Sequence, residues 1–149
     1  MSNYVAEIAN GLEAECRQSF AAGDFEGVLR KLEHHPKTGS GDQALAQIKA
    51  QALLELGHFK LALDICLEAH LLHPDATWPL YWGCLSGTYA GRFRDVLQLG
   101  SLYLTQPDDE IPSYAYMWIT AAFIECKLAD LGLVVARRGL RRTPGDAGL

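Results

Sequence analysis

The residues in this sequence whose types and spacing are best suited to chemistry are one cysteine and two histidines. Cys66, His70 and His73 follow the pattern C-x3-H-x2-H, and spacings of three and four residues place side chains on one face of an α-helix. Thiolate sulfur and imidazole nitrogen are common zinc ligands, so a metal-binding regulatory protein is one hypothesis. The alternative, which we favour, places Cys66 in an apolar core and His73 at the end of a helix, with no metal bound.

The sequence contains no motif that is typical of an enzyme. No serine stands in a nucleophile elbow, there is no glycine-rich phosphate loop, and no pair of carboxylates is tied to a cleft. The cysteines lie far apart without a CxxC pair and are expected to be small buried apolar side chains: Cys16, Cys66, Cys84 and Cys126. We therefore expect no catalytic residue, no metal site and no cofactor.

Composition and charge narrow the class of protein further. The chain has 149 residues, 49% of them apolar and 21% charged, with a formal net charge of −5, which is typical of one folded domain. An acidic chain does not present the basic surface that general nucleic-acid binding requires. Glutamates interrupt the N-terminal segment, and the longest apolar run, Tyr114 to Ile124, is too short to span a bilayer. These features predict a cytoplasmic protein that is not inserted in a membrane.

Charge is distributed unevenly along the chain. Residues 1–126 carry 8 basic and 16 acidic side chains, whereas residues 127–149 carry 5 basic and 2 acidic ones. The basic excess comes from a cluster near the C-terminus: Arg137, Arg138, Arg141 and Arg142. Such a cluster suits the dipole at the C-terminus of a helix, or it binds an acidic segment of a partner. The acidic run from Asp108 to Glu110 is expected to be a solvated loop.

The elements that position these residues follow from a repeat of 34 residues. The strings AAGDFEGVL, ELGHFKLAL and YAGRFRDVL contain Gly23, Gly57 and Gly91, each followed two residues later by a phenylalanine. A fourth unit follows when two residues are added in the loop TQPDDEIP, and Lys127 then takes the position of the glycine. Apolar residues recur at helical spacings, and no stretch alternates as a strand does. The sequence predicts an all-α fold of eight helices in four hairpins.

This pattern resembles the tetratricopeptide repeat (TPR) family, whose unit is a helix–turn–helix of 34 residues. The central copy fits best, and its matching residues are Ala50, Phe59, Ala62, Ala69 and Pro74. The resemblance implies a right-handed solenoid of about four hairpins in a single domain over residues 1–149. Its repeats span approximately 9–42, 43–76, 77–112 and 113–146. The second helix of the first repeat is expected to be about one turn short, because Pro36 and a polar loop interrupt it.

The resemblance also implies a partner-binding groove, because the first helix of each hairpin lines the concave side of such solenoids. The groove residues that it implies are Gln47, Gln51, Leu54, Trp78, Tyr81, Leu85, Tyr89, Tyr114 and Met117. Several are aromatic, which suits an extended or helical apolar segment of a partner protein. We expect at least two of the rings to face the groove. The inner helices carry few cations, so a groove that grips a C-terminal carboxylate, as in cochaperones of the family, is not expected.

These features imply a non-enzymatic protein–protein interaction module that acts as a chaperone or adaptor. A small acidic TPR chain without other domains is also similar to the bacterial type III secretion chaperones, which hold translocator or needle subunits until export. The alternative within the binding class is a permanent scaffold subunit of a larger complex.

The last predicted helix leaves the end of the solenoid open to two interpretations. Its first part is apolar, with Leu128, Leu131, Leu133, Val134 and Val135, whereas solenoids usually finish with a polar capping helix. One interpretation packs most of these side chains against the partner helix of the same hairpin. The other covers them with another subunit, in a homodimer or a heterocomplex.

Overall fold

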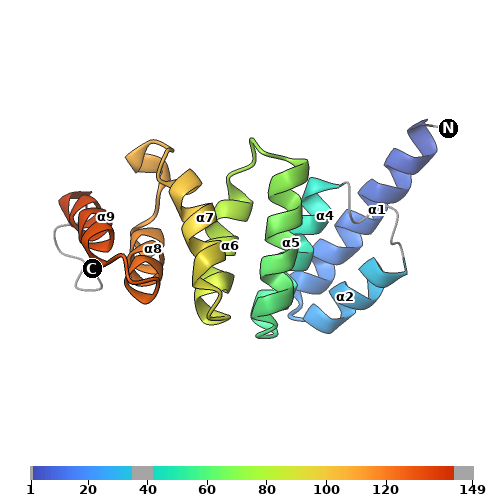
Figure 1. Cartoon of the computed structure of the whole chain (residues 1–149). Helices are drawn as coiled ribbons and strands as arrows, with labels where there is room; N and C mark the ends of the chain where they lie inside the picture. The colour runs from blue at the N-terminus through green and yellow to red at the C-terminus, as the bar shows by residue number, and fades with distance from the viewer. Residues whose placement is uncertain (1, 35–41, 143–149) are drawn as a thin grey trace. The chain divides into compact units, whose positions relative to one another are not determined.

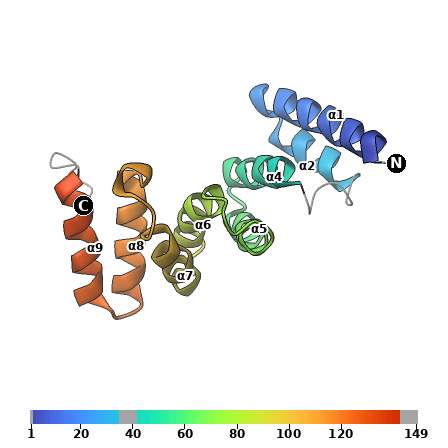
Figure 2. The ribbon, with the colours of Figure 1, turned by 90° about the horizontal axis from the view of Figure 1, so that it is seen from above.

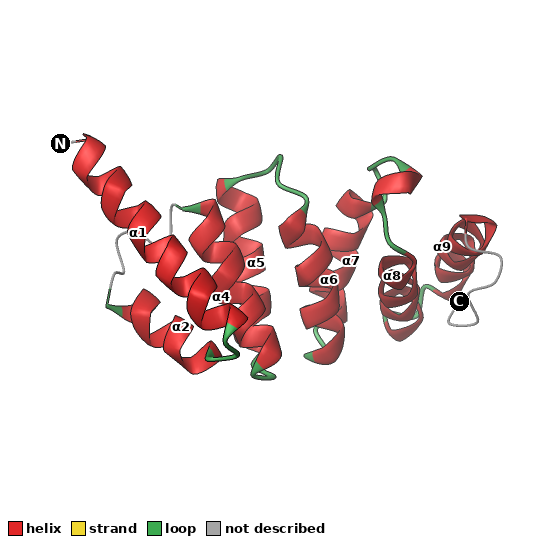
Figure 3. Ribbon diagram, turned by 180° about the vertical axis from the view of Figure 1, so that it is seen from behind, coloured by secondary structure: helices red, strands yellow, loops and turns green. Residues whose placement is uncertain are grey.

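A computed structural model gives the fold of this chain and describes residues 2–34 and 42–142. Over these residues every regular element is a helix, so the prediction of an all-α fold is confirmed (Figure 3). In chain order the elements are α1 (Ser2–Ala21), α2 (Phe25–Glu33), α4 (Gln43–Glu55), α5 (Phe59–Leu72), α6 (Trp78–Tyr89), α7 (Phe93–Tyr103), the 3₁₀-helix η1 (Asp108–Glu110), α8 (Ser113–Glu125) and α9 (Ala129–Arg142) (Figure 1). They follow one another as the hairpins α1–α2, α4–α5, α6–α7 and α8–α9.

The turns inside these hairpins share one backbone geometry. Gly23, Gly57 and Gly91 have φ of 76°, 74° and 69°, and Lys127 has φ of 65°. At the second turn Gly57 N donates to the carbonyl three residues back at 3.0 Å, and the next amide donates to the carbonyl five residues back at 2.8 Å. This is the Schellman pattern that ends many helices, and it recurs at the other three turns. Lys127 therefore occupies the glycine position of the repeat, although a side chain is strained in this region of φ.

Contacts within the chain define two compact units, residues 1–79 and 80–149, and each is described by itself. In the first unit α1, α2 and α4 pack on one another, and α5 packs on α4. Their common core consists of Leu12, Cys16, Val28, Leu32, Leu45, Ile48 and Ala52. Asp24 begins α2 by accepting a hydrogen bond from Gly27 N at 2.9 Å, and Asp42 begins α4 in the same way.

In the second unit α8 packs on both α7 and α9, and α8 and α9 lie side by side in two perpendicular views (Figures 1 and 2). Glycines allow these close approaches. A Cβ at Gly100 of α7 would lie 2.7 Å from Ile119 Cγ1 of α8, and a Cβ at Gly132 of α9 would lie 3.2 Å from Phe123 Cβ. The fully buried side chains of this unit include Cys84, Val96, Leu99, Ile111, Tyr116 and Ile119.

Two features of the repeat pattern can be compared with the helices. The second helix of the first repeat is short, as expected, because α2 has 9 residues and α5 has 14. Pro36 and the loop expected to cause this lie outside the described residues. The single domain over residues 1–149 stays a prediction. Within the described ranges, no helix is both long and apolar enough to cross a membrane.

Candidate functional site

One side of α6 carries the aromatic residues predicted for a groove. Trp78, Tyr81, Leu85 and Tyr89 recur at spacings of three or four residues, so they share one side of the helix. Tyr89 is 65% exposed, and the other three are half-buried. The opposite side of α6 faces the core, and its buried residues are Leu80, Gly83, Cys84 and Gly87. The accessible side of α6 is therefore the side that the repeat pattern selects.

The accessible side of α8 is arranged in the same way. Tyr114, Met117 and Ile124 lie on one side of the helix at helical spacing, and Tyr114 is 60% exposed while Met117 is half-buried. The buried residues Ala115, Tyr116, Ile119 and Ala122 lie on its other side, and the buried Trp118 lies one turn after Tyr114, next to it. An exposed ring thus stands on α8, in the same unit as the exposed Tyr89.

Tyr81 and Tyr114 meet on Trp118, a residue that the sequence analysis did not select. The centroid of the Trp118 ring lies 5.3 Å from that of Tyr81, edge to face, and 6.4 Å from that of Tyr114, nearly parallel. Trp118 is only 6% exposed, so it forms a buried base for the exposed Tyr114. Burial and, secondarily, the nearby Tyr114 phenol raise the pKa of Tyr81, so this phenol is neutral at neutral pH. The spacing of four residues between Tyr114 and Trp118 was the signal that could have identified Trp118.

The two helices that form this cluster have almost no formal charge. Helix α6 contains no Asp, Glu, Lys or Arg, and α8 contains only Glu125, its last residue. The two aliphatic hydroxyl groups of α6 bond within the helix: Ser86 Oγ donates to Trp82 O at 2.7 Å, and Thr88 Oγ1 donates to Cys84 O at 2.8 Å. We define the aromatic site as Tyr81, Leu85, Tyr89, Tyr114, Met117 and Trp118. Such a surface binds by apolar contact and shape rather than by ion pairs.

The remaining residues predicted for the groove belong to the first unit. Gln47, Gln51 and Leu54 lie on α4, and all three are half-buried. Trp78 begins α6 just before the boundary between the units, and its Nε1–H is buried without a hydrogen-bond partner in the described part of the chain. These four residues are not part of the aromatic site, and their place in a common groove stays a prediction.

The cysteine and histidines that suggested a metal site do not form one in the described part of the chain. Cys66 is fully buried, and burial raises the pKa of its thiol to about 12, which opposes the thiolate form that zinc requires. His73 ends α5, and its N–H bonds to Ala69 O at 2.8 Å. Over residues 2–34 and 42–142, no group of three His, Cys, Asp or Glu side chains could hold a metal ion. Cys66 in the core and His73 at a helix end agree with the interpretation that we favoured.

The expectation of buried cysteines is confirmed for three of them and wrong for the fourth. Cys16, Cys66 and Cys84 are buried, whereas Cys126 is half-exposed. Cys126 follows the last residue of α8, where the chain turns toward α9, so it lies at the surface rather than between helices.

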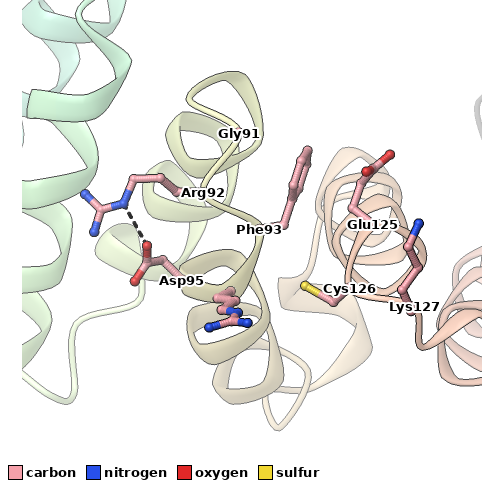
Figure 4. Close-up of a pocket in the computed structure, with 8 residues that line it drawn as sticks. Gly91, Arg92, Phe93, Asp95, Glu125, Cys126 and Lys127 are labelled. Carbon is pink, nitrogen blue, oxygen red and sulfur yellow. Dashed lines mark hydrogen bonds and ion pairs between the residues drawn. The ribbon is translucent and has the colours of Figure 1, made fainter.

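A surface pocket of about 560 Å³ lies at the turns of the α6–α7 and α8–α9 hairpins (Figure 4). Its lining residues are Gly91, Arg92, Phe93, Arg94, Asp95, Glu125, Cys126 and Lys127. Arg92 Nε donates to Asp95 Oδ2 at 2.8 Å, the contact dashed in Figure 4. The lining carries charges of both signs and therefore indicates no single class of ligand.

The acidic run and the arginine cluster meet in one ion pair. Arg138 donates to Asp108 Oδ1 from Nε at 2.7 Å and to Leu104 O from Nη1 at 2.8 Å, and Tyr116 Oη donates to the same Asp108 oxygen at 3.0 Å. The hydrogen bonds from Arg138 and then Tyr116 hold the pKa of Asp108 below its ordinary value. Asp108, Asp109 and Glu110 are all exposed, as expected for this acidic run, and Asp108 in addition joins η1 to α9 through its ion pair with Arg138.

The apolar residues of the last hairpin are mostly exposed. The side chains that are 44% to 59% exposed are Leu128, Leu131, Leu133 and Val134, whereas Val135 is buried. The interpretation that packs most of them against the partner helix is wrong, because Gly132, Val135 and Gly139 form the side of α9 that is buried. Cover by another subunit stays a prediction.

Comparisons with known proteins bear on the fold. No family model matches the sequence, and no curated protein matches it. Three similar solved structures are a MamA RS-1 ArsTM double mutant (TM-score 0.80, 15% identity, covering 93% of this chain and 76% of that chain), MamA 41-end from Desulfovibrio magneticus RS-1 (0.79, 15%, 93% and 77%) and a further crystal structure of MamA (0.77, 14%, 95% and 81%). This likeness supports the TPR-like fold of helical hairpins.

Proposed function

We propose that this chain is a non-enzymatic protein–protein interaction subunit that holds an uncharged, apolar segment of a partner on the aromatic site. The observation that carries the proposal is the pairing of Tyr81 and Tyr114 with Trp118 on two helices whose only charged residue is Glu125, at the C-terminal end of α8. Exposed rings on a buried aromatic base lose little conformational freedom on binding. The fold is consistent with this function, because helical-repeat folds present extended binding surfaces.

The chemistry of the site defines the kind of segment that it accepts. A charged side chain placed on this surface would lose its hydration without gaining a counter-charge. Leucine, methionine and aromatic side chains would instead bury apolar area against Tyr89, Tyr114 and Met117. The partner segment is therefore neutral over the part that touches these rings.

Within this function we favour a chaperone or adaptor, of the kind that type III secretion chaperones represent, over a permanent scaffold subunit. The support is that neutral apolar segments aggregate when they are left exposed, so a protein that covers them keeps their owner soluble. Purification of the complex from its native source distinguishes the two. One small partner that is stable only with this chain indicates a chaperone, and a fixed assembly of several subunits indicates a scaffold.

A peptide selection tests the binding site. A random peptide library displayed on phage is selected against the whole chain, and the affinity of the selected peptides is measured by fluorescence anisotropy. The double variant Tyr89→Ala/Tyr114→Ala removes the two exposed rings, and its dissociation constant is expected to rise about tenfold or more, since aromatic contacts dominate such interfaces. Tyr81 and Trp118 are kept because they support the fold around the site.

The matched control is Leu71→Ala, which removes an 81%-exposed apolar side chain from α5 in the other unit. The control is expected to bind the peptides as the original chain does, and circular dichroism checks that all three proteins are equally helical. Equal affinity of the original chain and the Tyr89/Tyr114 variant would contradict the proposal.

A further inference from the structure

Helix α9 has an apolar stripe that the rest of the described chain leaves partly exposed. Ala129, Leu133, Ala136 and Leu140 follow one another at intervals of four, three and four residues. Leu133 is 49% exposed and Leu140 is 37% exposed, while Ala129 is exposed and Ala136 half-buried. These four residues are called the α9 stripe below.

The contacts of α9 show which way the stripe faces. Successive residues of a helix are rotated by about 100°, so the stripe lies about 100° around the helix from Gly132, Val135 and Gly139, the side that is buried. It lies about 170° from Arg138, which binds Asp108 and Leu104 O in the preceding segment. The stripe therefore faces away from the loop after α7 and lies outside the side of α9 that is buried.

The spacing of the stripe is that of a coiled-coil seam. Intervals of four, three and four residues are those of successive d and a positions in a heptad, and side chains at these positions pack into a facing helix. Leu133 and Leu140 take a positions, and Ala129 and Ala136 take d positions. A stripe with alternating large and small side chains suits a helix that presents small residues opposite the leucines.

The charged residues beside the α9 stripe are complementary to those of a second, antiparallel copy of α9. Asp130 and Arg137 take the e positions, and neither side chain forms an ion pair with a described residue. In an antiparallel pair, a positions face d positions and e positions face e positions. Leu133 of one copy then packs against Ala136 of the other, and Asp130 of each copy lies beside Arg137 of the other. The same helix run parallel would lack this match.

We propose that α9 pairs with α9 of a second copy of this chain, antiparallel across a two-fold axis. Each copy contributes the α9 stripe, and two symmetric Asp130–Arg137 ion pairs fix the register. A two-fold contact of this kind uses the same patch on both subunits. The proposal does not rest on the aromatic site, which lies on α6 and α8.

A charge swap tests this interface on the whole chain. Sedimentation velocity measures the dimerisation constant of the original protein, of Asp130→Arg, of Arg137→Asp and of the double variant. Each single variant places like charges together at both symmetric positions and is expected to weaken the dimer about tenfold. The double variant restores opposite charges across the axis and is expected to recover the original constant. If the single variants weakened the dimer by disturbing the fold, the double variant would contain both disturbances and would not recover. Recovery therefore indicates ion pairing between copies.

Two apolar substitutions provide the matched comparison. Leu133→Asp lies in the stripe and is expected to abolish the dimer, whereas Val134→Asp alters a 59%-exposed residue on another side of the same helix and is expected to leave it intact. A monomer at every concentration overturns the proposal, as does a dimer that tolerates Leu133→Asp. Failure of the double charge variant to recover would also overturn it.

Discussion

Arg138 of α9 binds Asp108 of η1 across thirty residues of sequence. The guanidinium also donates to Leu104 O, and its carbon lies 5.9 Å from the centroid of the Tyr116 ring. Tyr116 in turn donates to Asp108. One arginine therefore connects the last helix to the end of α7, to η1 and to α8, and this sets it apart from the other arginines of its cluster.

The ion pair predicts a stability that depends on pH in the acid range. The pKa of Asp108 is lowered from its ordinary value of 3.8 in the folded chain, so its carboxylate stabilises the fold above that value and loses this effect as pH falls through the lowered pKa. We expect Asp108→Asn to melt at a lower temperature than the original chain at neutral pH. The difference should shrink as pH falls below 3.8. The control is Asp109→Asn, an exposed neighbour, and equal melting of both variants at neutral pH would contradict this account.

The turn at Lys127 predicts a stabilising substitution. Lys127 has φ of 65°, whereas the equivalent positions of the other hairpins hold glycine. Lys127→Gly is expected to raise the free energy of unfolding by about 1 kcal/mol, because glycine adopts this backbone without steric strain. The converse change, Gly57→Ala, is expected to lower it by about 1 kcal/mol, although a Cβ there would touch nothing within 4 Å. Urea unfolding measures both free energies. A loss of stability in Lys127→Gly together with a gain in Gly57→Ala would refute the shared turn geometry.

The close approach of α7 and α8 predicts a position that does not tolerate a methyl group. A Cβ at Gly100 would lie 2.7 Å from the fully buried Ile119 side chain. Gly100→Ala is expected to lower the free energy of unfolding by about 1–3 kcal/mol, because overpacking forces the helices apart. Gly11→Ala is the matched control in α1, where nothing lies within 4 Å, and it is expected to stabilise by about 0.5–1 kcal/mol. Thermal denaturation measures the stability of both variants. Unchanged stability of Gly100→Ala would argue against this packing.

The turns are the part of the fold that the sequence predicts best. The repeat marked Gly23, Gly57 and Gly91 and placed Lys127 at an equivalent position, because one backbone conformation is needed at every hairpin. The groove positions implied by the TPR resemblance likewise selected the sides of α6 and α8 on which Tyr89 and Tyr114 are exposed, since a helix fixes the direction of each side chain.

The parts that the sequence did not predict depend on contacts between distant segments. The role of Asp108 requires Arg138, thirty residues away, and neither residue type indicates the other. Trp118 was missed because the repeat pattern assigns groove positions one helix at a time, whereas this ring owes its importance to Tyr81 on a different helix. For the apolar residues of α9 the sequence left two interpretations open. The packing of α9 against α8 through Gly132 determines which of them are exposed.

The central claim is that the aromatic site binds its partner by apolar contact. The most direct test compares how a positive and a negative charge in a bound peptide change its affinity. One central apolar residue of a selected peptide is replaced by Lys in one version and by Glu in another, and both are titrated against the chain. Because α6 carries no charge and α8 carries only Glu125 at its C-terminal end, both replacements are expected to weaken binding by about tenfold or more. Weakening by one sign together with tighter binding by the other would show recognition of charge and would contradict the assignment of the aromatic site.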